Sequence, residues 1–186
     1  MTTDAGHSPV ALTGTPGTGK SRVGALLRDT YDVIEVGAWA LHTGYGRRRG
    51  ASVTVAMAEL TRAFRRLHRA EPHEVYVGHL AHLLPIRDVV VLRCHPRELG
   101  RRLGRARRGS PRDRQENAVA EALDLILLEA LAPGRRVWEI DTTGRSPSAV
   151  AREVSHRLAR RGPTRAGRVR WLEDPSVTDY LLEQAP

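Results

Sequence analysis

The chain has 186 residues, enough for one substantial hydrophobic core but not comfortably for two. Its 40% hydrophobic and 27% charged residues are ordinary for a globular protein, and no apolar run approaches the roughly 18 residues of a membrane span. The net charge of +9 favours polyanionic partners, whereas 4% aromatic residues disfavour recognition of single strands by base stacking. Residues 1–8 lack the features of a secretion signal, so we expect a cytoplasmic protein. The single cysteine, Cys94, excludes an internal disulfide and is expected to be half-buried.

The first predicted strand, Val10–Thr13, leads into a glycine-rich segment, Gly14–Ser21, that reads G-x-x-x-x-G-K-S. An apolar segment, Val23–Leu27, continues as the expected helix. This strand, loop and helix context predicts a P-loop, in which backbone N–H groups and the helix N-terminus hold phosphate oxygens. Lys20 is expected to reach the terminal phosphates of a nucleotide, and the Ser21 hydroxyl to bind Mg²⁺. The alternative is an ordinary glycine turn.

The lysine of this motif favours the P-loop. The chain has 30 lysine and arginine residues, and Lys20 is its only lysine. A phosphate cradle uses a compact ammonium on a flexible stem, which a planar guanidinium does not imitate. The exception therefore falls where phosphate chemistry explains it.

Strands and helices alternate along the rest of the chain. Further strands are expected at Asp32–Val36, Glu74–Val77, Asp88–Arg93 and Arg136–Ile140. Helices are expected at Lys20–Arg28, Val55–Arg69, Arg97–Arg108 and Gln115–Leu131, and from Ser146 to the residue before Gly162. This order predicts an α/β fold, a parallel five-stranded sheet with helices on both faces. Ligands of such folds bind at the carboxyl ends of the strands.

The segment Gln115–Leu131 has the clearest helical periodicity. Its apolar residues recur at helical spacing, and its acidic residues lie mostly off the apolar face. The apolar set is Val119, Leu123, Ile126, Leu127 and Ala130, and the acidic set is Glu116, Glu121, Asp124 and Glu129. The pattern predicts one continuous amphipathic helix.

Two basic segments interrupt the alternation. Gly44–Gly50 is rich in glycine and arginine without an apolar period, so it predicts a mobile or anion-facing loop. Arg105–Arg114 lies between two helices, and it is either a solvated charge run or a lid whose arginines close over a triphosphate. Pro163–Pro186 is predicted as a linker and a tail that docks Trp171 and Leu181 on the domain, with a partner-binding tail as the alternative.

Several phrases together carry a family resemblance that spacing alone does not reveal. They are the P-loop, Ile34–Gly37, Gly78–Pro85, Val91–Pro96, Glu116–Asp124 and Ile140–Pro147. From about Val10 to Leu158, the chain resembles the archaeal branch of the adenylate-kinase-like P-loop family. The eukaryotic relatives of that branch are the nuclear adenylate kinase isoenzyme and coilin-interacting nuclear ATPase.

The resemblance implies a nucleoside-monophosphate-kinase fold. Its kinase-like domain would span 1–162, with a monophosphate-binding insertion at about 35–58 and a short lid at about 106–116, followed by a linker and tail at 163–186. ATP and Mg²⁺ are the implied cofactors, and the implied activity passes a phosphoryl group from ATP to AMP or water. The resemblance also implies late small-ribosomal-subunit (16S rRNA) maturation, with a platform ribosomal protein and the pre-ribosomal particle as partners.

The resemblance also assigns site residues by position. The implied ATP-binding set is Gly14, Gly17, Thr18, Gly19, Lys20, Ser21, Arg22, Arg107, Thr143 and Gly144. Lys20, His79 and the lid arginine Arg107 are the implied catalytic residues, and Ser21 the implied Mg²⁺ ligand. Thr143 and Gly144 follow the fifth strand, where such kinases contact adenine through backbone groups. A hydrogen-bonded structural histidine is the alternative for His79.

The chain departs from the family pattern at carboxylates. The family usually has an acidic residue two before the histidine of the third-strand phrase, and this chain has Val77. An acidic residue usually follows the glycine after the second strand, and this chain has Ala38. Leu41 stands where an arginine often serves the monophosphate, although Arg47–Arg49 lie close by in sequence.

Two other functions stay open on the sequence. The first is a nucleotide-gated ribosome-assembly factor with slow or lost turnover, favoured by the missing carboxylates and the net charge of +9. The second is a P-loop kinase of another small metabolite, because the fold does not fix the phosphoryl acceptor.

Overall fold

Five parallel strands form the central sheet of the structure, a computed structural model that describes residues 8–50, 52–67, 73–107 and 109–183. Across the sheet the order is β2-β5-β1-β6-β7. The bounds are Val10–Thr13 for β1, Asp32–Glu35 for β2, Glu74–Val77 for β5, Asp88–Arg93 for β6 and Arg136–Asp141 for β7. The five predicted strands are confirmed, and so is the α/β fold class.

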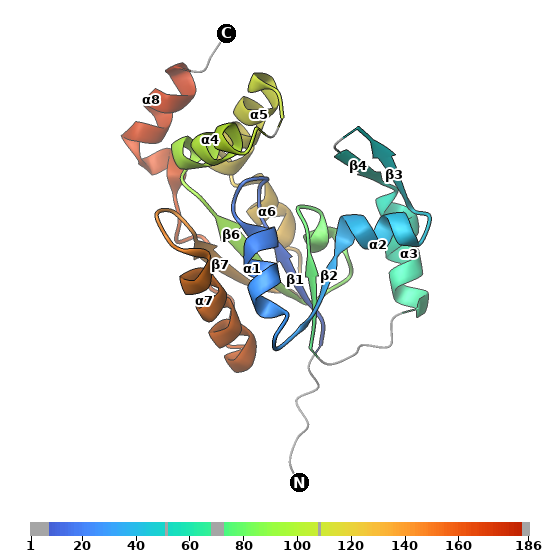
Figure 1. Ribbon diagram of the computed structural model, residues 1–186. Helices are drawn as coiled ribbons and strands as arrows, with labels where there is room; N and C mark the ends of the chain where they lie inside the picture. The colour runs from blue at the N-terminus through green and yellow to red at the C-terminus, as the bar shows by residue number, and fades with distance from the viewer. Residues whose placement is uncertain (1–7, 51, 68–72, 108, 184–186) are drawn as a thin grey trace.

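Helices cover both faces of the sheet (Figure 1). One face carries α1 (Lys20–Leu27) and α7 (Pro147–Arg160). The other face carries α2 (Val36–His42), α3 (Met57–Leu67), the short helix η1 (Ala81–Leu83) and α6 (Leu125–Ala130). Beyond the carboxyl ends of the strands lie α4 (Pro96–Arg105), α5 (Pro111–Ala122) and α8 (Pro175–Glu183), which form the upper left part of Figure 1.

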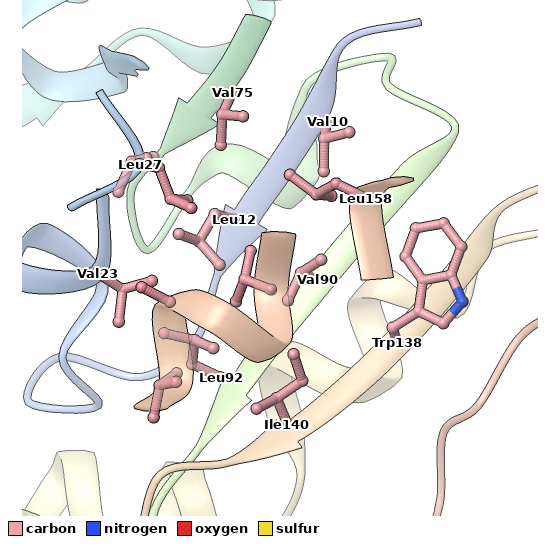
Figure 2. Packing of buried hydrophobic residues seen from close by; sticks show 14 residues of the cluster. Val10, Leu12, Val23, Leu27, Val75, Val90, Leu92, Trp138, Ile140 and Leu158 are labelled. Atoms are coloured by element: carbon pink, nitrogen blue, oxygen red, sulfur yellow. The ribbon is translucent and has the colours of Figure 1, made fainter. Parts of the chain in front are cut away.

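The hydrophobic core lies on both faces of the one sheet, in two parts that follow from the alternation of side chains along buried strands. Val10 and Leu12 pack with α1 and α7, whereas Ala11 packs with the helices of the opposite face. Figure 2 shows the first core, in which Trp138 and Leu158 close the end beside β7. Because β1 lies in the middle of the sheet, both cores fix the strand from which the glycine-rich loop begins.

The basic segment at Gly44–Gly50 was predicted as a loop, and this prediction is wrong. The segment is part of an antiparallel hairpin. Its strands are β3 (Gly46–Arg49) and β4 (Ser52–Val55), with Arg47 opposite Thr54. The positive φ angles of Gly44 and Gly50 bend the chain at both ends of β3. The hairpin therefore presents three exposed arginines, Arg47–Arg49, on a defined scaffold.

The predicted continuous helix over Gln115–Leu131 is wrong. It is broken into α5 and α6 at Asp124, whose φ of 57° is left-handed. The assigned faces are also wrong, since Glu121 is buried while Val119 and Leu123 are partly exposed. Aspartate tolerates this conformation, and the break lets the Asp124 carboxylate pair with Arg93.

The segment after α7 is docked along the domain. The backbone of Arg165 bonds to Val137 and Glu139 of the edge strand β7. Further on, η2 (Trp171–Glu173) leads into α8, and Trp171 is buried with Val177 beside the half-buried Leu181. The predicted docking of Trp171 and Leu181 is confirmed. Among the described residues, no helix is long and apolar enough to span a membrane.

Two adjacent leucines of α1 test this packing. Leu27 is 1% exposed in the first core and Leu26 is 49% exposed. Leu27→Ala should lower the free energy of unfolding by about 2–5 kcal/mol, because it leaves a cavity between helix and sheet. Leu26→Ala should change it by about 0.5 kcal/mol or less. Urea unfolding followed by circular dichroism measures both, and equal losses would contradict the assignment of faces.

Candidate functional site

The loop after β1 has positive φ angles, which favour glycine, at Gly14, Gly17 and Gly19. Gly14 has a φ of +139°, and a Cβ there would lie 2.3 Å from the carbonyl oxygen of Leu92. Gly17 has a φ of +98°, and a Cβ there would press on Leu99 and Leu103 of α4. The loop is thus wedged between β6 and α4, which fixes the ring of backbone that a phosphate would enter.

The basic group inside this ring is Lys20. Its ammonium donates to the carbonyl oxygens of Gly14 at 2.6 Å and Thr15 at 2.9 Å, and the residue is only 9% exposed. The Thr18 hydroxyl also donates to the Thr15 oxygen. A lysine held this way carries its positive charge at the centre of the loop.

The loop also offers unused backbone donors. Within the part of the chain that the structure describes, the N–H groups of Gly17, Gly19 and Ser21 have no hydrogen-bond acceptor. They lie at the start of α1, where the helix dipole adds positive potential. Ser21 and Arg22 are exposed beside them. This donor set fits a chain of nucleotide phosphates, and the exposed Ser21 hydroxyl fits Mg²⁺, which needs few protein ligands when phosphates supply the others.

Two titratable side chains face the charge of Lys20 from neighbouring strand ends. Glu35 is the last residue of β2, where partial burial raises the pKa of its carboxyl and the charges of Arg28 and Lys20 oppose the rise. His79 follows β5, and desolvation together with the charges of Lys20 and His82 lowers the pKa of its imidazole, although part of the residue is open to solvent. The sequence prediction placed His79 here but assigned Glu35 no role.

The departures from the family pattern are also visible. Val77 at the end of β5 is fully buried against α1, and Ala38 is exposed on α2. Neither position offers a carboxylate to the loop. Any carboxylate that acts on the phosphates must therefore come from another residue.

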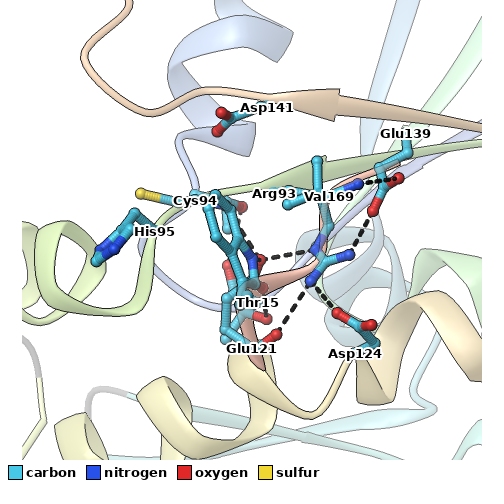
Figure 3. A network of polar contacts seen from close by, with 12 residues as sticks. Thr15, Arg93, Cys94, His95, Glu121, Asp124, Glu139, Asp141 and Val169 are labelled. Atoms are coloured by element: carbon cyan, nitrogen blue, oxygen red, sulfur yellow. Dashed lines mark hydrogen bonds and ion pairs between the residues drawn. The ribbon is translucent and has the colours of Figure 1, made fainter. Parts of the chain in front are cut away.

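A buried polar network, which the sequence analysis missed, anchors the P-loop (Figure 3). The Glu121 carboxylate accepts hydrogen bonds from the Thr15 hydroxyl at 2.5 Å, from Arg93 Nε at 2.7 Å and from the Cys94 N–H at 3.1 Å. It also accepts one from Trp171 Nε1 at 3.1 Å. One carboxylate thus joins the P-loop, the end of β6 and the C-terminal tail.

Arg93 is the positive partner in this network. Its side chain is 2% exposed and pairs with Glu121, Asp124 and Glu139. Burial of the guanidinium is outweighed by Glu121 and Asp124, which raise the pKa of Arg93. An arginine directly after the apolar run 89–92 was the sequence signal that could have pointed to a buried carboxylate.

The cysteine beside this network is more deeply buried than predicted. Cys94 is fully buried with Leu99 and Leu103, rather than half-buried. Burial raises the pKa of its thiol to about 12. It is therefore a packing residue under the base of α4.

The predicted adenine loop lies across α4 from the P-loop. Thr143 donates to Asp141 Oδ1 through both its N–H and its hydroxyl, and its hydroxyl oxygen accepts from the His95 N–H at 2.8 Å. Arg102 of α4 donates to the Thr142 carbonyl oxygen at 2.8 Å. Gly144, with a φ of +65°, is exposed at the tip. The loop is thus held at a fixed position relative to α4.

Among the described residues, no hydrogen bond or ion pair joins the predicted lid residue Arg107 to the P-loop. It has a φ of 50° in the turn after α4 and is exposed, and its guanidinium forms no hydrogen bond or ion pair within the described residues. Half of the predicted lid is the first turns of α5, which Ser110 and Asp113 close with a capping box. Arg108, also predicted in this segment, lies outside the described residues.

His82 belongs to a second buried arrangement beneath the P-loop. Its Nδ1 lies 2.9 Å from the hydroxyl of Thr13, the residue before Gly14, and its Nε2 lies 2.7 Å from Glu129 of α6. Both ring nitrogens are thus engaged by protein groups. Burial is the main cause that lowers the pKa of His82, and Glu129 opposes it.

Comparison with known proteins adds the family. The model of the AAA domain family matches residues 10–124. A Thermococcus onnurineus protein named "Putative adenylate kinase" is 38% identical over 176 residues, which are 93% of this chain and 97% of that protein. The chain belongs to this adenylate-kinase-like P-loop family. A Thermococcus gammatolerans member with the same name is 40% identical over 88% of this chain and 93% of its own length.

The fold of this family member also occurs outside close relatives. The crystal structure of an uncharacterized protein from Eubacterium ventriosum matches with a TM-score of 0.52 at 8% identity, covering 82% of this chain and 98% of that one. This likeness concerns the fold alone. Together with the P-loop geometry, family membership gives the chain a nucleotide-kinase-like P-loop function.

A charge-removing substitution tests the network. Glu121→Gln keeps the shape but removes the carboxylate shared by Thr15, Arg93 and Trp171. It should lower the free energy of unfolding by at least about 2 kcal/mol and weaken ATP binding, because charged buried hydrogen bonds are lost. Glu116→Gln, an exposed residue of the same helix, is the control and should change stability by about 0.5 kcal/mol or less. Equal unfolding midpoints for the two variants would refute the anchoring role.

The buried histidine predicts a pH dependence. Because the pKa of His82 is lowered in the folded protein, the unfolded chain binds protons first as the pH falls below about 6.5. Stability should therefore be full above about pH 7 and decrease as the pH falls through about 6.5. His82→Gln should flatten that decrease, whereas His156→Gln, at an exposed position of α7, should not. Urea midpoints across this range decide, and parallel curves for wild type and His82→Gln would exclude His82 as the cause.

Proposed function

We propose that the protein transfers the γ-phosphoryl group of ATP to AMP, or more slowly to water. The observation that carries the proposal is the buried Lys20 at the centre of a glycine loop with unused N–H donors, in a member of an adenylate-kinase-like family. In the transfer to AMP, the bond from the γ-phosphorus to the bridging oxygen breaks and a bond to an oxygen of the AMP phosphate forms. The products are two molecules of ADP.

The donor side of the reaction rests on the P-loop. Lys20 exchanges its contacts with the Gly14 and Thr15 carbonyl oxygens for phosphate oxygens, and the N–H groups of Gly17, Gly19 and Ser21 bind the phosphates. Such donors stabilise the charge that develops on the transferred group. Ser21 would hold Mg²⁺, which supplies charge neutralisation to the phosphates when bound. Thr143 and Gly144 are proposed to contact the adenine through their backbone groups.

The acceptor side is proposed at the insertion. Arg47–Arg49 lie on the hairpin that follows α2, and strand alternation places Arg47 and Arg49 on one face and Arg48 on the other. In Figure 1 the hairpin and helices α4 and α5 stand on opposite sides of the P-loop. Exposed guanidinium groups there suit a monophosphate, in place of the arginine replaced by Leu41. Arg107 is proposed to reach the transferred group only when its segment moves.

A ribosomal role remains a prediction of the resemblance. The basic surface, with a net charge of +9, is compatible with a pre-ribosomal particle and a platform protein. Salt-sensitive co-sedimentation with small-subunit particles would support this role. No association at low salt, with or without ATP, would remove it.

An assay of ADP formation tests the catalytic proposal. With Mg²⁺, ATP and AMP, Lys20→Met should reduce ADP formation at least about 100-fold, because the donor nearest the phosphates is lost. Arg152→Met, at an exposed position of α7, removes one basic residue without touching the loop and should keep wild-type activity. Omitting AMP separates transfer from hydrolysis. Wild-type protein with no activity above Lys20→Met would reject the enzyme and leave a nucleotide-binding factor.

A further inference from the structure

Val77, which stands where a carboxylate was expected, lies next to a glutamate on the neighbouring strand. In the pairing of β2 with β5, Val33 lies opposite Val75 and Glu35 lies opposite Val77. Both strands end at this pair, at the carboxyl edge of the sheet beside the P-loop strand β1. Glu35 is thus one strand further from β1 than Val77, at the same height.

The Glu35 side chain shares the α1 face of the sheet. A Cβ placed on Gly24 of α1 would lie 3.2 Å from the Val77 side chain and 3.5 Å from the Val33 side chain, so both valines point towards α1. Side chains alternate along a strand, so Glu35, two residues after Val33, leaves the backbone on the same side. This is the side on which Lys20 and Ser21 begin α1.

The Glu35 carboxylate has no structural partner that explains it. Within the described residues it forms no hydrogen bond or ion pair, although it is half-buried and feels the charges of Lys20 and Arg28. A half-buried carboxylate without a fixed partner is costly unless something charged completes its surroundings. A divalent cation on the nucleotide phosphates would do so.

We propose that Glu35 supplies, from the neighbouring strand, the carboxylate that Val77 does not, and orders the Mg²⁺ and its water ligands beside Ser21. This inference rests on the proposed function. A glutamate is one methylene longer than an aspartate, which makes up part of the distance of about 4.8 Å between neighbouring strands. Mg²⁺ keeps most of its waters and asks for only one or two protein groups, so Ser21 and Glu35 suffice with the phosphates.

The direct experiment measures metal affinity instead of turnover. Mn²⁺ is titrated into the complex of each protein with a non-hydrolysable ATP analogue, and free Mn²⁺ is followed by electron paramagnetic resonance. Glu35→Gln should weaken Mn²⁺ binding about tenfold or more. Asp32→Asn removes an exposed carboxylate from the other end of the same strand and should leave Mn²⁺ affinity unchanged.

Two further measurements separate this role from a structural one. In EDTA, Glu35→Gln should bind the analogue as tightly as wild type or more tightly, since a negative charge near the phosphates is gone; weaker binding would indicate that Glu35 only positions Lys20. Adding Val77→Asp to Glu35→Gln should restore Mn²⁺ affinity, because the carboxylate returns at the neighbouring strand end. If Glu35→Gln lowers the urea midpoint of unfolding, Glu35→Asp is used in its place. It keeps the charge but withdraws it by one methylene, so a smaller loss of Mn²⁺ affinity is expected.

The outcomes are distinct. Mn²⁺ affinity unchanged by substitution of Glu35, in a protein that binds the analogue, overturns the inference and leaves the proposed function standing. Wild-type protein that does not bind the analogue in EDTA overturns the proposed function itself.

Discussion

The carboxylate of Glu121 is the contact on which the arrangement of the P-loop depends. It is 2% exposed and holds the Thr15 hydroxyl, the Arg93 guanidinium and the Trp171 indole at once. A buried ion pair seldom adds much stability over apolar residues, but breaking one is expensive and its geometry is demanding. Its value is to fix the loop that the glycines leave flexible. The backbone freedom of Gly14 and Gly17 and the rigidity of the Glu121 network are complementary requirements of one phosphate cradle.

A second constraint concerns which strand end places a carboxylate beside the P-loop. The family resemblance leads one to expect a carboxylate at the end of the strand next to β1. The buried Val77 stands there instead, and the pairing of β2 with β5 brings Glu35 alongside it. Parallel strands end at one edge, so a function lost on one strand is recoverable on the next without changing the fold. Desolvation and the charge of Lys20 lower the pKa of His79, which disfavours a second positive charge beside the loop.

The sheet was predictable because its strands are apolar runs bounded by turn residues, and the P-loop because its glycines and lone lysine have a local meaning. The break at Asp124 was not, since Arg93, the partner of its carboxylate, lies 31 positions earlier in the chain. The burial of Glu121 was not predicted from the helical pattern for the same reason, because its partner Arg93 is also distant in sequence. In the hairpin, the arginines are in a strand because glycines bend the chain at either end and β4 pairs with it. A charged run has only a weak propensity for strands, so the sequence did not predict this. Glu35 looked like an ordinary strand residue until its neighbour in the sheet was known.

The docking of Trp171 also affects the order in which the site forms during synthesis of the chain. A chain leaves the ribosome from its N-terminus, so Thr15 is made before Glu121, and Trp171 is made after both. The carboxylate that anchors the P-loop receives its last donor only when η2 has emerged and α8 can close over it. The nucleotide site is therefore completed last although its motif is synthesised first. A chain that stops short of Trp171 carries the whole P-loop sequence and still lacks one of the groups that hold it in place.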